Sequence, residues 1–192
     1  MPVAMLLIGY LLGSIPFGLI VTRLGGAGDL REIGSGNIGT TNVLRTGRKG
    51  LAALTLLLDA GKGATAVALA RSSAPDCMSI AAAAAFLGHL YPVWLRFRGG
   101  KGVATMLGIA LALDWRIAIV VALAWLGGAL LSRYSSIGGM VSAIVAPLAA
   151  AVMARFDLAL LFLAFAVLVL WKHRGNIERL LAGTEPRIGE AS

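Results

Sequence analysis

Residues 2–24 read PVAMLLIGYLLGSIPFGLIVTRL, and Arg23 is the only charged residue among them. About 20 consecutive apolar residues are enough to cross the hydrocarbon core of a bilayer as a helix. No small-residue cleavage pattern follows this run, so we expect a retained membrane span and not a cleaved signal peptide. The chain is therefore predicted to begin with a helix embedded in lipid.

The composition of the whole chain agrees with a membrane protein. Of its 192 residues, 58% are hydrophobic and 14% are charged, and the mean hydropathy is +0.86. Soluble domains contain about 45–50% apolar and about 25% charged residues, so a soluble globular protein is excluded. Further apolar runs cover approximately residues 50–70, 77–95, 102–113, 115–131, 137–154 and 156–171. We predict an all-α polytopic membrane protein, a bundle of seven transmembrane helices that forms one domain over residues 1–192.

The basic residues predict how these helices are oriented. Lys and Arg accumulate in short loops on the cytoplasmic side of a membrane. With seven spans and an extracytoplasmic N-terminus, most of the 17 Lys and Arg fall on the cytoplasmic side, together with the C-terminus. The residues on that side are Arg23, Arg31, Arg45, Arg48, Lys49, Arg96, Arg98, Lys101, Arg133, Lys172, Arg174, Arg179 and Arg187.

The run 102–113 is short and could merge with 115–131 into one span. That merger would move Arg133 and the basic tail outside and weaken the asymmetry, so seven spans remain the better prediction. The net charge of +8 is then explained by orientation, and nucleic acid is not an expected partner.

Metal and disulfide chemistry find little support in the sequence. The chain has one cysteine, Cys77, and two histidines, His89 and His173. No carboxylate cluster accompanies them. We therefore expect no internal disulfide, no metal site and no cofactor.

The first polar cluster covers residues 34–45, which read GSGNIGTTNVLR. Its three glycines allow backbone N–H groups to turn inward, and its hydroxyls, amides and Arg45 add hydrogen-bond donors, as phosphate binding requires. The loop lacks the Gly-Lys-Ser/Thr ending of a P-loop. A glycine-rich turn that caps a helix is the alternative explanation. The candidate phosphate ligands are Gly34, Ser35, Gly36, Asn37, Thr41, Asn42 and Arg45.

The second cluster covers residues 96–102, which read RFRGGKG. Because Lys101 lies between glycines, its ammonium group can approach a bound anion without interference from neighbouring side chains. We predict Gly99, Gly100 and Lys101 as anion ligands. A basic anchor at the membrane interface is the alternative explanation.

The third candidate lies inside the second predicted span. Asp59 and Lys62 are three residues apart, which places them on one face of a helix. Isolated charges are costly in lipid and usually face an interior or a cavity. Lys62 is a candidate substrate ligand, and a purely structural ion pair with Asp59 is the alternative.

Two further clusters precede the sixth predicted span and follow the last one. Residues 132–139 read SRYSSIGG, and Ser136 there could complete an anion clamp or cap the next helix. Residues 172–179 read KHRGNIER. If the last helix continues through them, His173 and Asn176 share one face at headgroup level.

Together these motifs resemble the bacterial integral-membrane acyl-phosphate:glycerol-3-phosphate acyltransferase family. The family's loop often has Ala where this chain has Thr40. The matching motifs are GSIPFG at 13–18, GSGNIGTTN at 34–42, GHLYP at 88–92, GGKGVAT at 99–105 and KHRGNIERL at 172–180.

The resemblance implies an enzyme of the bacterial inner membrane with seven helices and an extracytoplasmic N-terminus. It would transfer a fatty acyl group from acyl phosphate to the 1-hydroxyl of glycerol 3-phosphate, giving lysophosphatidic acid and phosphate in the first step of phospholipid synthesis. By the same resemblance, the loop at 34–42 and the turn at 99–102 hold phosphate, while His173 and Asn176 lie beside glycerol phosphate. The expected partners are the two substrates and the lipid bilayer, and we expect a monomer.

Acyl phosphate is already activated, so we expect direct transfer in one step, without an acyl-enzyme. The expected catalytic residues are Lys101, His173, Asn176 and Ser35. The base that accepts the hydroxyl proton has two candidates. They are neutral His173 and the substrate's own phosphate, whose second pKa is about 6. Lys101 and backbone N–H groups would stabilise the oxyanion and the departing phosphate.

Two other functions compete with this one. An enzyme that uses acyl-CoA or acyl carrier protein would carry a His-x-x-x-x-Asp motif, but His89 is followed by LYPVW. An anion transporter would show inverted repeats and broken helices at mid-membrane. Here the polar clusters gather at one predicted face, which favours an enzyme at the membrane surface.

Overall fold

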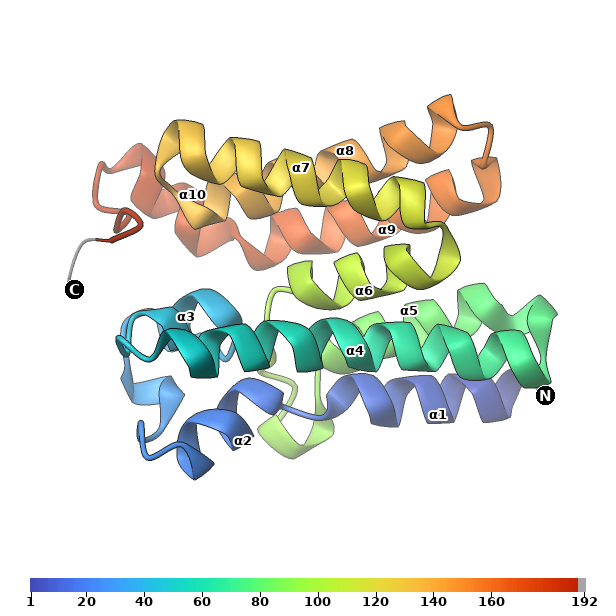
Figure 1. The fold of residues 1–192 in the computed structure, drawn as a ribbon, viewed down its shortest axis with the longest axis horizontal. Coiled ribbons are helices and arrows are strands. Elements are labelled where there is room, and N and C mark those ends of the chain that lie inside the picture. Colours follow the sequence, from blue (N-terminus) through green and yellow to red (C-terminus); the bar gives the residue numbers. More distant parts are fainter. Residues whose placement is uncertain (190–192) are drawn as a thin grey trace. The chain divides into compact units, whose positions relative to one another are not determined.

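The computed structural model describes residues 1–189, and every regular element in that range is helical. The all-α prediction is therefore confirmed for the described residues (Figure 1). The α-helices are α1 (Pro2–Ser14), α2 (Phe17–Leu24), α3 (Thr40–Leu44), α4 (Lys49–Ser73), α5 (Met78–Leu90), α6 (Val103–Leu113), α7 (Trp115–Ser132), α8 (Ser135–Val152), α9 (Phe156–Lys172) and α10 (Arg174–Leu181). Three short 3₁₀ helices are η1 (Leu30–Glu32), η2 (Pro75–Cys77) and η3 (Val93–Leu95).

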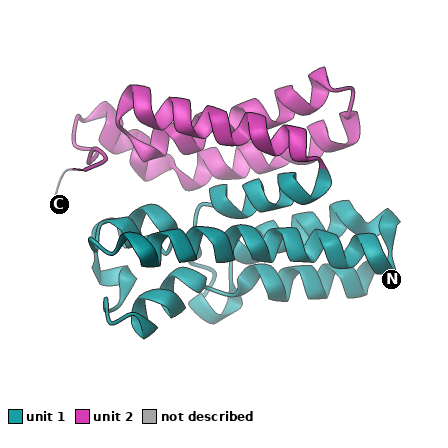
Figure 2. Ribbon diagram, in the orientation of Figure 1, with its two compact units in different colours: residues 1–113 teal, residues 114–192 magenta. Residues whose placement is uncertain are grey.

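The chain divides into two compact units, residues 1–113 and 114–192 (Figure 2). Unit 1 contains α1 to α6, and unit 2 contains α7 to α10. That residues 1–192 act as one functional domain stays a prediction.

Close helix contacts in unit 1 depend on glycine. A Cβ atom on Gly13 of α1 would collide with the backbone of Ala85 in α5, and one on Gly108 of α6 would collide with the backbone of Ala60 in α4. Helices in a membrane gain no hydrophobic driving force from one another, so such close backbone approach is a main source of their packing energy. These two glycines let α5 pack closely against α1, and α6 against the long helix α4.

The first apolar run is broken between α1 and α2. Pro16 cannot continue the helix, so α1 ends at Ser14, and carbonyls of its last turn have no N–H partner from a following helical turn. Two side chains replace those partners: Lys62 Nζ donates to the Ile15 carbonyl at 2.8 Å, and Trp94 Nε1 donates to the Ser14 carbonyl at 3.1 Å. The break is thus closed by a lysine from α4 and a tryptophan from η3.

Unit 2 consists of three long helices and a shorter one. Helix α7 packs on α8, and α8 packs on α9. At His173 the chain bends by 54° between α9 and α10, because this residue has φ −94° and ψ 2°, outside helical values. The last helix therefore continues through residues 172–179 only with a bend, and His173 and Asn176 do not lie on one straight helix.

Five stretches of described helix are long and apolar enough to cross a membrane. They are residues 2–24, 49–73, 75–95, 115–132 and 135–152. Helices α9 and α10 together would make a sixth, and α6 is a shorter apolar helix of 11 residues. Many large apolar side chains on these helices are exposed, including Leu131 at 92% and Val152 at 88%, as lipid contact requires. The count of seven spans and the orientation of the termini stay predictions.

Candidate active site

The loop before α3 is held in shape by its own polar groups. Gly34 and Gly36 have φ of +53° and +66°, in the left-handed region that favours glycine. The Asn37 side-chain oxygen accepts a hydrogen bond from Gly39 N–H at 3.0 Å. Gly18 of α2 lies so close to the Ile38 carbonyl that a Cβ atom would collide with it. The loop is therefore seated directly on the α2 backbone.

Asn42 is the buried centre of this loop. Its Oδ1 accepts from the Ser35 backbone N–H at 3.1 Å, and its Nδ2 donates to the carbonyls of Leu30 at 3.0 Å and Ile33 at 2.8 Å. An amide has two donor hydrogens and two acceptor positions, so most of its capacity is used inside the loop. Asn42 organises the loop, and its direct contact with a substrate stays a prediction.

The predicted ligands Ser35 and Arg45 lie in the same loop. Ser35 is exposed, and its hydroxyl lies 3.4 Å from Asn42 Oδ1. Arg45 directly follows α3, and its side chain passes over Gly34, where a Cβ atom would lie 2.9 Å from Arg45 Cδ. Thr41 lies within α3 and is half-buried. The structure thus brings together a hydroxyl, a guanidinium and a glycine-rich backbone, as an anion site requires.

The turn at residues 99–102 wraps around the end of α5. Gly99 N–H donates to the Leu90 carbonyl and Gly100 N–H to the His89 carbonyl, both at 3.1 Å. These bonds satisfy carbonyls that the end of a helix leaves without partners. The two N–H groups therefore cap α5, and phosphate binding by them stays a prediction. Lys101 follows directly and is half-buried.

Lys62 lies deep in unit 1. Its ammonium forms an ion pair with Asp59 Oδ1 at 2.7 Å, besides its bond to the Ile15 carbonyl. The side chains of Lys62 and Asp59 are each 2% exposed. These contacts match the structural alternative stated for the pair, and a direct role for Lys62 in substrate binding stays a prediction.

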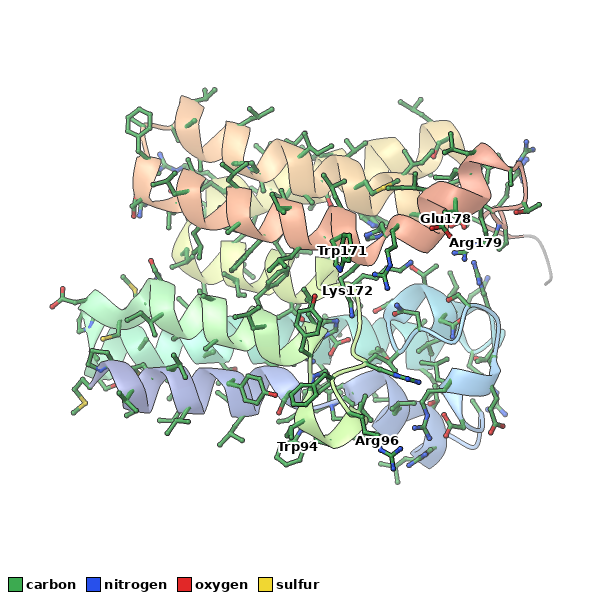
Figure 3. All side chains as sticks on the ribbon, turned by 180° about the vertical axis from the view of Figure 1, so that it is seen from behind. Trp94, Arg96, Trp171, Lys172, Glu178 and Arg179 are labelled. Atoms are coloured by element: carbon green, nitrogen blue, oxygen red, sulfur yellow. The ribbon has the colours of Figure 1, made fainter. Side chains whose placement is uncertain are left out.

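In unit 2 one carboxylate joins two of the predicted ligands. Glu185 Oε1 accepts from Ser136 Oγ at 2.7 Å and from Asn176 Nδ2 at 2.6 Å, and Glu185 Oε2 accepts from Arg179 Nε at 2.8 Å. Figure 3 shows Arg179 on α10, close to the C-terminal segment. Glu185 thereby holds the first turn of α8 and helix α10 to the C-terminal segment.

Burial raises the pKa of the Glu185 carboxyl, but hydrogen bonds from Asn176, Ser136 and Arg179 lower this pKa by more, so it lies below its ordinary value. Sequence reasoning did not single out this residue. The available signal was an acidic residue in a basic tail, after the last predicted helix.

His173 lies at the bend between α9 and α10 and is 2% exposed. Its Nδ1 lies 2.8 Å from the Val169 carbonyl, and a carbonyl can only accept. Nδ1 therefore carries the proton, and in the neutral ring Nε2 is the basic nitrogen. This is the tautomer that a general base at Nε2 needs.

Among the described residues, no group of three or more His, Cys, Asp and Glu side chains could hold a metal ion. Apart from the Glu185 carboxylate and His173, the side chains described above are donors suited to anions: hydroxyls, amides, an ammonium and a guanidinium. Their chemistry fits phosphate esters.

Known proteins resemble this chain over nearly its whole length. A family model described as glycerol-3-phosphate acyltransferase matches residues 3–183. A glycerol-3-phosphate acyltransferase of Mesorhizobium japonicum is 56% identical over 184 residues, covering 96% of this chain and 94% of the relative. One of Zymomonas mobilis is 58% identical over 197 aligned positions, covering 95% and 93%.

Solved structures agree with these sequence matches. The crystal structure of PlsY (YgiH), an integral membrane glycerol 3-phosphate acyltransferase, in its glycerol 3-phosphate form has a TM-score of 0.92 and 38% identity, covering 98% of this chain and 96% of that one. The lysophosphatidic acid form has a TM-score of 0.90 and 37% identity, covering 98% and 95%. The family model, which matches residues 3–183, and the relatives at 56% and 58% identity show that this chain belongs to the glycerol-3-phosphate acyltransferase family.

Proposed function

We propose that this protein transfers a fatty acyl group from acyl phosphate to the 1-hydroxyl of glycerol 3-phosphate, giving lysophosphatidic acid and phosphate. The observation that carries the proposal is the likeness, at TM-scores of 0.92 and 0.90, to PlsY structures named for a glycerol 3-phosphate form and a lysophosphatidic acid form. Acyl phosphate as the donor is supported by the resemblance of the motifs and by the two sets of anion-binding side chains, since both substrates then carry a phosphate.

The reaction is a direct acyl transfer. The 1-hydroxyl oxygen of glycerol 3-phosphate bonds to the acyl carbon, the bond from that carbon to the phosphate oxygen breaks, and the hydroxyl proton passes to a base. Lys101 stabilises the negative charge on the acyl oxygen and on the departing phosphate. Ser35 and Arg45 bind phosphate, and Asn176 and His173 bind glycerol 3-phosphate.

The base is either His173 or a phosphate oxygen of the substrate. The contact from His173 Nδ1 to the Val169 carbonyl supports the histidine, because it fixes Nε2 as the basic nitrogen. The variant His173→Ala separates the two bases: loss of a general base lowers kcat by about 10²–10⁴-fold. A decrease of only a few-fold would assign the proton to the substrate phosphate.

We also propose that the enzyme is a monomer in the bacterial inner membrane with a cytoplasmic active site. The exposed apolar side chains and the predicted bias of basic residues support this placement. Cysteines introduced singly at Thr46 and Ser73 test the orientation, because only the cytoplasmic position should resist a membrane-impermeant thiol reagent in intact cells.

The test of the activity is phosphate release from palmitoyl phosphate by the purified protein in detergent. Release should require glycerol 3-phosphate and produce lysophosphatidic acid, and palmitoyl-CoA should be inert. Turnover of palmitoyl-CoA in place of palmitoyl phosphate would contradict the proposed donor. No turnover of either donor would contradict the enzyme, and anion flux into liposomes would then test a transporter.

A further inference from the structure

Unit 1 contains a buried group of three ionisable side chains that the proposed chemistry does not use. Asp59, Lys62 and His89 are 2%, 5% and 4% exposed when backbone and side chain are counted together. Lys62 Nζ lies 2.7 Å and His89 Nδ1 lies 3.7 Å from the same carboxylate atom, Asp59 Oδ1. Taking charged groups out of water costs several kcal/mol each, and pairing repays this cost only in part unless the geometry is excellent, so this cluster is an expensive feature of the fold.

One side of the cluster reaches the broken helix. Lys62 donates to the Ile15 carbonyl at 2.8 Å, next to Pro16. A structural purpose for Lys62, and for Asp59 as its counter-ion, is thereby accounted for. It does not account for a histidine beside them.

The other side of the cluster reaches the glycine turn. His89 is buried in the last turn of α5, and its carbonyl accepts from Gly100 N–H at 3.1 Å. A Cβ atom on Gly100 would collide with His89 Nε2, so the imidazole ring lies directly against the turn. Its Nδ1 edge faces Asp59, and its Nε2 edge faces the residue before Lys101.

We infer that His89 is a positioning residue for Lys101. Asp59 orients the imidazole ring, the ring supports the backbone of Gly100, and that contact fixes where the Lys101 side chain begins. The inference rests on the proposed function of Lys101. Catalytic groups must be held to within about 0.5 Å, and a displacement of about 1 Å can cost about 10²-fold in rate.

A double-mutant cycle with palmitoyl phosphate and glycerol 3-phosphate tests this inference. We expect His89→Ala to lower kcat by about tenfold or more, with the KM for glycerol 3-phosphate changed by less than about threefold, because the lost interaction acts on the transition state. Since His89 acts through Lys101, His89→Ala combined with Lys101→Ala should be no slower than Lys101→Ala alone. Effects that multiply would overturn the inference.

Thr55 provides the matched control. It is buried on α4, one turn before Asp59, and its hydroxyl donates to the Leu51 carbonyl of the same helix at 2.8 Å. Thr55→Ala should change kcat by less than about twofold, and any change should multiply with that of Lys101→Ala. If the kcat effects of Thr55→Ala and Lys101→Ala were as non-additive as those of His89→Ala and Lys101→Ala, the coupling would be a general packing effect. That result would overturn the inference.

If His89→Ala does not yield folded protein, His89→Gln replaces it. Glutamine keeps an amide donor for Asp59 but has no ring to lie against Gly100, so the same non-additivity is expected. The result also separates this inference from the proposed function. If Lys101→Ala has the kcat of the wild type, the proposed role of Lys101 is wrong and the inference falls with it. If Lys101→Ala is slow but the kcat losses of His89→Ala and Lys101→Ala multiply in the double variant, only the inference is overturned.

Discussion

The two polar regions of this enzyme are built in different ways. In unit 1 the side chain of Asn42 organises the loop at 34–45 through bonds to backbone groups of Leu30, Ile33 and Ser35. The turn at 99–102 is shaped by backbone hydrogen bonds to α5 and by close glycine contacts. In unit 2 the shape depends on Glu185, which joins Ser136, 49 residues away, to Asn176, nine residues away. Glycine-rich motifs in the sequence indicate the first kind of site, whereas the second kind depends on one side chain, Glu185, from the C-terminal segment.

The largest expected effect concerns the support of unit 1. Asp59→Asn leaves Lys62 as a buried cation without its counter-charge, which should cost about 3–5 kcal/mol of folding stability. Thermal unfolding in detergent measures this loss.

Asp76→Asn is the matched control, because Asp76 is exposed on η2. It should leave the unfolding temperature unchanged. An equal decrease of the unfolding temperature in both variants would mean that the buried ion pair of Asp59 contributes no more to the stability of unit 1 than an exposed carboxylate does.

Lys101→Ala should come next, and its effect should fall on activity and not on stability. Removing one donor that stabilises an oxyanion costs about 10²–10³ in kcat, or roughly 2.7–4 kcal/mol. Steady-state kinetics measures kcat, and the unfolding temperature should stay within error of the wild type. A Lys101→Ala variant with normal kcat would contradict the assignment of Lys101, in unit 1, as the positive charge that stabilises the oxyanion.

Glu185→Ala should affect the stability of unit 2. It leaves Ser136, Asn176 and Arg179 without the acceptor that they share, at a cost of about 1.5–3 kcal/mol for hydrogen bonds to a charged group. Thermal unfolding measures the loss.

The neighbouring acid Glu178 on α10 is exposed, and Glu178→Ala should have little effect (Figure 3). If the two variants were equally stable, the carboxylate would not be what holds the polar end of unit 2 together.

The smallest expected effect is a pH dependence of that same carboxylate. The pKa of Glu185 lies below its ordinary value of 4.5 in the folded protein, so its contribution to stability is complete above that value and is lost as the pH falls through the folded pKa. The difference in unfolding temperature between wild type and Glu185→Gln should be constant from pH 8 to about 5 and shrink at lower pH. A difference that grows on acidification would reverse the assigned sign.

Several features were open to prediction because they depend on local sequence. The apolar runs predict the helices, since an uninterrupted run of that length must satisfy its backbone internally in lipid. The glycines of the loop and the turn mark positions that no side chain can occupy, as Gly34 and Gly100 show. Family membership followed from the same motifs.

Other features were closed to prediction because they depend on contacts between distant residues. The bend at His173 was not expected, since KHRGNIER contains no proline to announce it. The donation from the N–H groups of Gly99 and Gly100 to α5 carbonyls was not foreseen, and phosphate binding by these glycines stays a prediction.

Sequence alone was thus sufficient to predict a helical membrane acyltransferase and to name the loops that carry its polar chemistry. Periodicity, hydropathy and glycine spacing are properties of neighbouring residues. The bilayer then requires each apolar run to form a helix, because its backbone groups find no water to bond to. Tertiary structure decided which distant groups meet: Glu185 with Ser136 and Asn176, and His89 with the Asp59–Lys62 pair that the spacing already suggested. A buried charge must find a partner wherever the fold brings one near, and residues far apart in the chain meet only once it has folded.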